Sequence, residues 1–146
     1  MDKQKRMQLK ELLHSALKAE GAEMGIIRNY ESADDELVVI SHFGLPKEYL
    51  SHFYSVKPFD TTSCGRAFGI SSTILINDIE QDLAFKKHLK TIRALNAEFR
   101  AVKSVPILTS RGRKLGVFTS HFYEPKWDWH FNHNDKILTE MADLLY

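Results

Sequence analysis

The stretch "FRAVKSVPILTSRGRKLGVFTSHF", Phe99 to Phe122, decides the fold because it holds two apolar segments around a polar turn. We predict that "RAVKSVPIL" and "KLGVFTSHF" are strands and that "TSRGRK" joins them. Gly112 can supply the positive φ that a tight turn requires. Pro106 inside the first strand implies a sheet edge, a bulge or an irregularity on the side of a ligand. The stretch therefore predicts a hairpin late in the chain.

The sequence pattern near the N-terminus, from residue 3 to residue 43, predicts one helix and a second hairpin. A helix is expected from about Lys3 to Ala19, and Gly21 is a plausible stop for it. The segments "MGIIRNY" and "ELVVISHF" flank the polar turn "ESADD" and should pair as strands. We expect one face of the second strand to carry Leu37, Val39 and Phe43, and the other face to carry Val38 and Ile40. Apolar side chains on both faces predict a sheet that is covered on both sides.

The middle of the chain predicts short elements. "LPKEYLSHF" should be a helix opened by Pro46, and the N-cap residue types at Asp60 to Ser63 should start another helix through Phe68. "TILIND" is expected to be a strand. "DLAFKKHLKTIRAL" is expected to be a helix capped by Asp82. Its apolar side should consist of Leu83, Phe85, Leu89, Ile92 and Leu95.

The last helix, "NDKILTEMADLLY", is expected to be capped by Asn132 or Asn134. The predicted order is therefore helix, hairpin, helical insertion, strand, helix, hairpin and helix. This order predicts an α+β fold, a mainly antiparallel sheet with the terminal helices on one face and the middle helices covering the other.

Composition limits the class of protein. The 146 residues are 43% hydrophobic and 27% charged, with a net charge of +1. These values predict one globular domain over residues 1–146, with an N-terminal helix within 1–20 and a C-terminal helix at 132–145. The neutral balance gives no reason to expect nucleic acid. No apolar run approaches the roughly 20 residues that span a bilayer, so we expect no membrane segment. The single cysteine fits a reducing compartment, and we expect a cytoplasmic location.

Several segments, in order, resemble GAF domains of bacterial sensor proteins, especially sensor histidine kinases. They are "SCGRA" (Ser63 to Ala67), "INDIEQDLAF" (Ile76 to Phe85), the stretch Phe99 to Phe122 and the closing amphipathic helix. The resemblance runs from about Ala16 to Leu145. It implies a five- or six-stranded antiparallel sheet with the first and last helices on one face. It also implies short helices that roof a small-molecule pocket on the other face, and a regulatory role that uses the terminal helices.

Cys64 allows several hypotheses. As a nucleophile at a helix start, it could be activated by the helix and Arg66, with His42 or His121 as base. The simpler interpretation is a small buried side chain. A related GAF group reduces free methionine sulfoxide with the help of a resolving thiol, which this chain does not contain. GAF photoreceptors typically place histidine directly after the cysteine that anchors a bilin, whereas Gly65 follows Cys64 here.

Nucleotide and metal sites have weaker support. Asn77, Asp78 and Phe85 match only part of the signature of GAF domains that bind cyclic nucleotides. The segment "DWHFNHND" offers Asp128, His130, His133 and Asp135, but it precedes the helix and is expected to be a solvated loop, so we expect no metal site. Trp127 and Trp129 are expected to pack on the domain, with a partner surface as the alternative.

A general pocket is the remaining hypothesis, with an ordinary filled core as the alternative. We predict no catalytic residue and no resident cofactor. The pocket candidates combine roof residues with side chains of the late hairpin: Phe53, Phe59, Cys64, Phe68, Phe85, Leu89, Ile92, Val105, Val117, Thr119 and His121.

The sequence therefore predicts a non-catalytic sensory domain of a bacterial signal-transduction protein, of the two-component type, which binds a small molecule. We expect it to form a homodimer through its terminal helices and to signal through them. The alternatives are a dimerisation module without a pocket and an enzyme that uses the Cys64 thiol.

Overall fold

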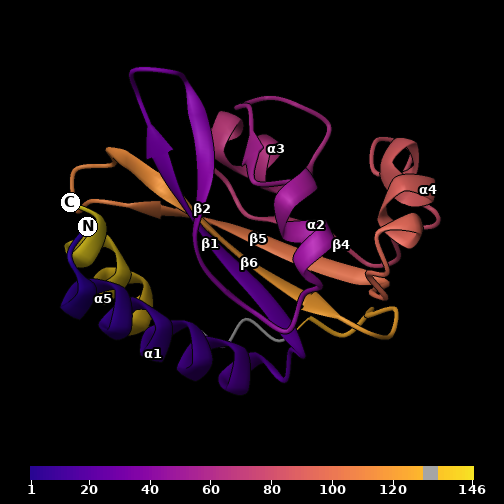
Figure 1. The fold of residues 1–146 in the computed structure, drawn as a ribbon, viewed down its shortest axis with the longest axis horizontal. Coiled ribbons are helices and arrows are strands. Elements are labelled where there is room, and N and C mark those ends of the chain that lie inside the picture. Colours follow the sequence, from indigo (N-terminus) through magenta and orange to yellow (C-terminus); the bar gives the residue numbers. More distant parts are fainter. Residues whose placement is uncertain (130–134) are drawn as a thin grey trace.

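A six-stranded antiparallel sheet forms the centre of the computed structural model, which describes residues 1–129 and 135–146 (Figure 1). The strand order across the sheet is β3-β2-β1-β6-β5-β4. The strands are β1 (Met24–Glu31), β2 (Glu36–Phe43), β3 (Ser55–Val56), β4 (Ile74–Ile76), β5 (Ala101–Leu108) and β6 (Lys114–Phe122). The α+β architecture predicted from the sequence is confirmed, with six strands.

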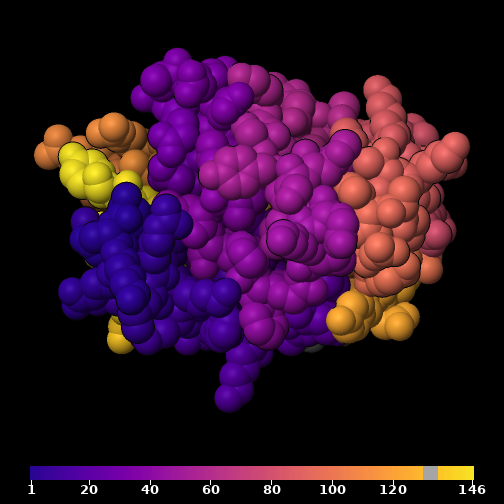
Figure 2. Space-filling view, viewed as in Figure 1, coloured from indigo at the N-terminus to yellow at the C-terminus, as the bar shows by residue number. Residues whose placement is uncertain are grey.

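Helices cover both faces of this sheet. They are α1 (Lys3–Glu20), α2 (Lys47–His52), α3 (Ser63–Ile70), α4 (Lys86–Ala94) and α5 (Asp135–Leu145). Figure 1 shows α1 and α5 together on one side, which we call the back face. On the other side lie α2, α3 and α4, which together we call the roof. In the space-filling view the roof segments, magenta to salmon, cover the central and right part of the visible surface (Figure 2).

Caps at both ends define α1. The Asp2 side chain accepts a hydrogen bond from the backbone N–H of Lys5, and Gly21 ends the helix with φ 69°. The buried stripe of α1, Leu9, Leu13, Ala16 and Leu17, packs against back-face residues of the sheet and against Met141 of α5. The three-to-four spacing of this stripe is therefore explained by burial against a single face.

A bulge in β2 changes which side chains share a face. Arg28 pairs with Val39 and Ile27 with Ser41, so Ile40 is an extra residue in β2. After this residue the alternation is inverted, and the Phe43 ring contacts the ring of His14 from α1. The prediction that Phe43 lies on the same face as Val39 is therefore wrong.

The late hairpin forms as predicted and contributes two central strands. β5 pairs with β6 from Ala101↔Phe122 to Leu108↔Lys114, and Gly112 has φ 81° in the connecting turn. β4 pairs with β5 only up to Ser104. Pro106 therefore lies beyond the end of β4, where its missing N–H breaks no strand pairing, so the edge interpretation is confirmed.

The fourth helix is shorter than predicted. It begins at Lys86, and the Asp82 carboxylate accepts a hydrogen bond from the N–H of Phe85 in the preceding turn. Phe85 is buried, whereas the Leu83 side chain is 85% exposed. The prediction that Leu83 belongs to the apolar side is wrong because residue 83 lies in a turn, where helical spacing does not apply. The caps predicted at Asn132 or Asn134 lie outside the described residues.

Candidate functional site

A small cavity lies between the roof and the strands β1 and β6. Its volume is about 20 Å³, which gives room for about one water molecule. Roof and sheet both contribute to its wall, which consists of Ile26, Arg28, Tyr49, Phe53, Val56, Thr62, Ser63, Cys64, Phe85, His88, Ile92, Thr119 and His121. The wall is therefore apolar on the side of the core and polar around the start of α3.

The start of α3 is fixed by a hydroxyl cap. Thr62 is the N-cap, and its Oγ1 accepts a hydrogen bond from the Gly65 N–H at 3.1 Å. The Thr62 hydroxyl donates to the Asp60 carboxylate, which also accepts from the Thr62 N–H at 2.9 Å. The Cys64 thiol donates to Thr62 Oγ1 at 3.4 Å. Cys64 is therefore held as a buried thiol inside the cap of a helix.

Hydroxyl groups connect α3 to the sheet. Ser104 of β5 lies between two of them, at 2.9 Å from Ser63 Oγ and 2.7 Å from Thr119 Oγ1. All three residues are buried. Because each hydroxyl has a partner, this chain of hydrogen bonds satisfies the polar groups at the base of the cavity.

Arg28 is the charged side chain of the cavity wall. The residue is 3% exposed, and its Nη1 donates to the backbone oxygens of Leu37 at 3.3 Å and Tyr54 at 3.2 Å. Among the described residues, no carboxylate lies within ion-pair distance of this guanidinium. A guanidinium stays protonated at every pH that proteins tolerate. The cavity therefore carries one buried positive charge.

Burial keeps the neighbouring titratable groups neutral. Burial, with a smaller contribution from the charge of Arg28, lowers the pKa of His121 to about 3, and the Met24 carbonyl only partly offsets this. The Nδ1 atom of His121 has no hydrogen-bond partner among the described residues. Burial also raises the pKa of Tyr49, although the charge of Arg28 opposes it. At neutral pH the wall thus offers neutral donors and acceptors around Arg28.

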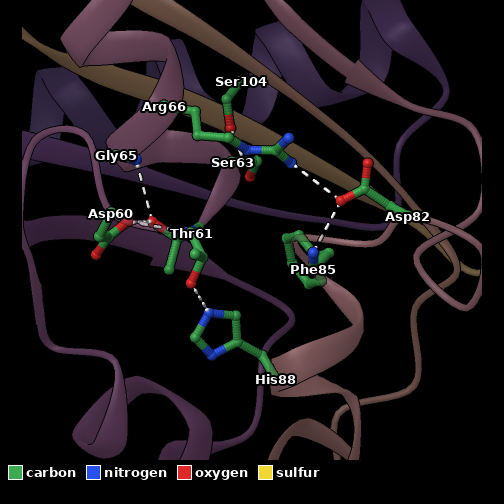
Figure 3. Close-up of polar contacts among 10 residues, drawn as sticks. Asp60, Thr61, Ser63, Gly65, Arg66, Asp82, Phe85, His88 and Ser104 are labelled. Carbon is green, nitrogen blue, oxygen red and sulfur yellow. Dashed lines mark hydrogen bonds and ion pairs between the residues drawn. The ribbon is translucent and has the colours of Figure 1, made fainter.

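Two polar contacts hold the roof together over the cavity (Figure 3). Thr61 Oγ1 and His88 Nε2 are 2.6 Å apart in a hydrogen bond that joins the loop before α3 to α4. Arg66 of α3 forms an ion pair with Asp82 at 3.3 Å. Burial lowers the pKa of His88, so the ring is mainly neutral at pH 7. Both contacts bridge roof segments that are distant in the sequence.

On the opposite side of the same strands, a buried ion pair fastens α1 to the sheet. Lys103 Nζ is 2.7 Å from Glu20 Oε1, with side-chain exposures of 14% and 8%. The Ser120 hydroxyl donates to the other oxygen of Glu20. Side chains alternate along a strand, so Ser120 lies between the cavity residues Thr119 and His121 but faces the back. The cavity and the end of α1 therefore share one segment of β6.

The structure brings six of the eleven predicted pocket residues together around the cavity. These are Phe53, Cys64, Phe85, Ile92, Thr119 and His121. The other five, Phe59, Phe68, Leu89, Val105 and Val117, do not line it. Leu89 packs in the roof core, while Phe68 and Val117 belong to a separate apolar cluster with Leu37.

Two of these five lie far from their expected positions. Phe59 has φ 65° and is 71% exposed. Its ring lies against Gly69 of α3 and does not line the cavity. Val105 alternates with Ser104 along β5 and pairs with the back-face residue Phe118, so it points away from the cavity. Both placements correct the expectation that these residues contribute to a pocket beneath the roof.

Seven wall residues were not predicted from the sequence: Ile26, Arg28, Tyr49, Val56, Thr62, Ser63 and His88. One signal was available for Arg28, because it stands two residues after Ile26 in a strand and so shares the face of that apolar side chain. The rest required knowledge of how the roof folds over the sheet.

The tryptophan pair divides between packing and exposure. The Trp129 ring packs edge-on against Phe122 at 5.5 Å, and its Nε1–H donates to Asn77 at 2.6 Å. Trp127 is 66% exposed, so the packing prediction is confirmed only for Trp129. Of the predicted loop residues, His130 and His133 lie outside the described part of the chain. Within that part, no three His, Cys, Asp or Glu side chains are grouped to hold a metal ion.

The comparisons with known proteins identify the family. The sequence profile described as "GAF domain" matches residues 9–136, most of the chain. The chain belongs to the GAF domain family. This family consists of sensory and regulatory domains, as the resemblance in the sequence implied. A comparison with curated protein sequences gave no match.

Solved structures share this GAF fold at low sequence identity. The GAF domain of a phosphoenolpyruvate-protein phosphotransferase from Coxiella burnetii is 17% identical, with a TM-score of 0.76 and coverage of 97% of this chain and 80% of that one. A domain assigned to a two-component sensor histidine kinase of Sinorhizobium meliloti 1021 is 15% identical, with a TM-score of 0.65 and coverages of 95% and 86%. The free methionine-R-sulfoxide reductase of Neisseria meningitidis, solved with its substrate, is 20% identical, with a TM-score of 0.68 and coverages of 97% and 75%. These neighbours show the fold and include both a regulatory domain and an enzyme.

None of the helices in the described ranges combines the length and the hydropathy of a membrane-spanning segment.

Proposed function

We propose that this GAF domain is a non-catalytic sensor that binds a small molecule in the cavity beneath the roof. One observation carries the proposal. Cavity residues Thr119 and His121 flank Ser120, which holds Glu20 at the end of α1 on the back face. A ligand that moves this segment of β6 would therefore change the contact that fixes the N-terminal helix.

The mechanism is a shift between two arrangements of the roof. The cavity of about 20 Å³ is too small for most metabolites, so a larger ligand favours an arrangement in which α3 and α4 have separated. The contacts that must give way are the Thr61–His88 hydrogen bond and the Arg66–Asp82 ion pair. The partners of both contacts are only partly buried, and such contacts contribute about 1 kcal/mol each.

A metabolite screen tests the proposal. We expect at least one compound to raise the melting temperature and to slow backbone hydrogen exchange in α3, α4 and the last turn of α1. Thr119→Val should reduce this response, while Thr139→Val on the exposed surface of α5 should leave it unchanged. A protein that no small molecule stabilises would instead support the alternative of a module without a ligand.

The terminal helices are the proposed output and the proposed dimer contact, in a cytoplasmic signalling protein of the two-component type. α1 and α5 pack together on the back face, and Met7 of α1 is an exposed apolar side chain. A homodimer through these helices would join the outputs of two sensors. Light scattering of the purified protein measures this directly, and Met7→Lys should shift the equilibrium towards the monomer.

The thiol enzyme is the second candidate because Cys64 and His121 line the same cavity. Two observations oppose it: the Cys64 thiol already donates to Thr62, and the sequence holds one cysteine. Reduction of free methionine sulfoxide, the activity named for the Neisseria protein, is the appropriate assay. Thiol-dependent turnover that Cys64→Ser abolishes would replace the sensor proposal by an enzyme.

A further inference from the structure

The buried charge of Arg28 has no counterion in the described structure. Arg28 is 3% exposed, and its hydrogen bonds use one nitrogen, Nη1, to reach two backbone oxygens. Guanidinium groups carry five N–H donors in a fixed plane. Burial of an ionised group without an opposite charge is costly, and proteins normally pair such groups or bind a ligand to them.

Three carboxylates of the 60–82 segment, which carries much of the roof, are engaged elsewhere. Asp60 accepts from the N–H groups of Lys57 and Thr62, and Asp82 pairs with Arg66. Asp78 holds Arg100 through two contacts of 3.0 and 2.7 Å. None of these forms an ion pair with Arg28, so its charge is left for a group that enters the cavity.

The groups around Arg28 suit an anion. No Asp or Glu side chain is among the described residues that line the cavity, and burial raises the pKa of Tyr49, so its phenol is neutral at pH 7. Tyr49 lines the same cavity, and its neutral hydroxyl can donate to an anion beside the guanidinium. The remaining wall near Arg28 is apolar, with Ile26, Phe53 and Val56.

We propose that Arg28 is the anchor of an anion site in this cavity, and that the ligand carries a carboxylate or a similar planar monoanionic group. Arg28 and a carboxylate match in shape, because two parallel N–H groups can donate to two oxygens. The inference rests on the proposed function, since it names the class of ligand for the same cavity. The small volume limits the group beside Arg28 to a few heavy atoms unless the roof opens.

Acetate and acetamide are matched probes because they have the same shape and differ in charge. Wild-type protein in a chloride-free buffer at constant ionic strength, set with sodium sulfate, is titrated with each. We expect acetate to raise the melting temperature by about 3–6 °C at ten times its Kd, with saturation, and acetamide to leave it unchanged. In the same titration followed by NMR, acetate should shift the side-chain Nε–H signal of Arg28. This signal is assigned as the one that is missing from the spectrum of Arg28→Lys.

Two variants place the effect at Arg28. Arg28→Gln should abolish the acetate response, and Arg28→Lys, which keeps the charge and loses the planar fork, should weaken acetate binding by about tenfold or more. Arg113→Gln, at an exposed arginine in the β5–β6 turn, is the control and should respond like the wild type. If Arg28→Gln does not fold, the Nε–H titration of the wild type still decides the question.

The outcomes separate this inference from the proposed function. If acetamide stabilises as well as acetate, or neutral compounds alone stabilise the protein, the cavity binds ligands but the anion site is wrong. If acetate leaves the Arg28 signal unchanged, Arg28 only holds the Leu37 and Tyr54 carbonyls, and the inference is likewise overturned. If neither probe nor any compound of the metabolite screen binds, the sensor proposal fails together with it.

Discussion

Thr62 is the residue on which the start of α3 depends. Its hydroxyl accepts from the Gly65 N–H and the Cys64 thiol, and it donates to Asp60. We expect Thr62→Ala to lower the free energy of unfolding by about 1–2 kcal/mol, as the loss of an N-cap does. Thr62→Ser keeps the hydroxyl and should cost much less. Urea denaturation of both variants measures the difference, and equal losses would mean that the methyl group, not the cap, matters at this position.

His121 makes stability depend on pH. Its pKa is about 3 in the folded protein and 6.5 when exposed, so between these values the unfolded chain binds a proton that the folded chain does not. This contribution is complete above pH 6.5 and is lost as the pH falls towards 3. The slope is at most about 1.4 kcal/mol per pH unit. We measure the free energy of unfolding by urea denaturation as a function of pH. We expect His121→Gln to make this free energy depend less steeply on pH between 6.5 and 4.5, and to leave the slope above pH 6.5 unchanged.

Arg28 shows what a single sequence hides at the scale of a residue. An arginine between Ile27 and Asn29 in a strand looks like a solvent-facing residue, because most arginines are exposed. Its burial follows from β3 and the 44–62 segment, which close over that edge of the sheet and supply the Tyr54 carbonyl. Cys64 was the more conspicuous residue, yet its thiol is engaged within a helix cap.

At the scale of elements, periodicity predicted which segments are helices and strands but not every face. The stripe of α1 and the late hairpin followed regular spacing, and both formed as expected. The extra residue Ile40 inverted the faces of β2, and a turn placed Leu83 in solvent. A bulge or a turn costs little free energy locally and is decided by tertiary contacts, so its position is not encoded in a pattern of apolar residues.

The attachment of α1 to the sheet depends on the Glu20–Lys103 pair. Because both side chains are mostly buried, Glu20→Gln leaves the Lys103 charge without its partner. We expect this variant to lose about 2–3 kcal/mol of unfolding free energy. Glu36→Gln, which breaks the exposed pair with Lys57, should lose less than about 1 kcal/mol and serves as the control. Equal small losses in urea denaturation would show that Glu20 does not anchor the helix.

Across the whole molecule, the single cysteine reports whether the roof opens. Cys64 is buried in the cavity wall, so a thiol reagent reaches it only after α3 or α4 moves. Thr61→Val removes the 2.6 Å hydrogen bond to His88, and we expect the labelling rate to rise about fivefold, which corresponds to about 1 kcal/mol. Thr139→Val, on the opposite face, should label like the wild type. An unchanged rate in Thr61→Val would mean that this contact does not hold the roof.

The same measurement tests whether the two faces of the sheet are coupled. If β6 transmits changes from the cavity to Glu20, linkage requires that weakening the Glu20 contact also favours the open roof. We expect Glu20→Gln to raise the rate of Cys64 labelling in the absence of urea. The labelling rate should depend only weakly on urea concentration, because a local opening exposes little new surface.

Met141→Ala is the matched control for this coupling. It removes a buried side chain from the apolar cluster that packs α1 and α5 on the back face, and it should destabilise the protein by at least as much as Glu20→Gln, about 2–5 kcal/mol. Within the described structure the polar partners of Glu20 are Lys103 and Ser120, not Met141, so the extra labelling of Met141→Ala should occur through global unfolding and should rise steeply with urea. If both variants showed the same steep dependence on urea, the faces would be independent. The terminal helices could then not read the cavity through Glu20, and the signal would have to pass through another contact of β6.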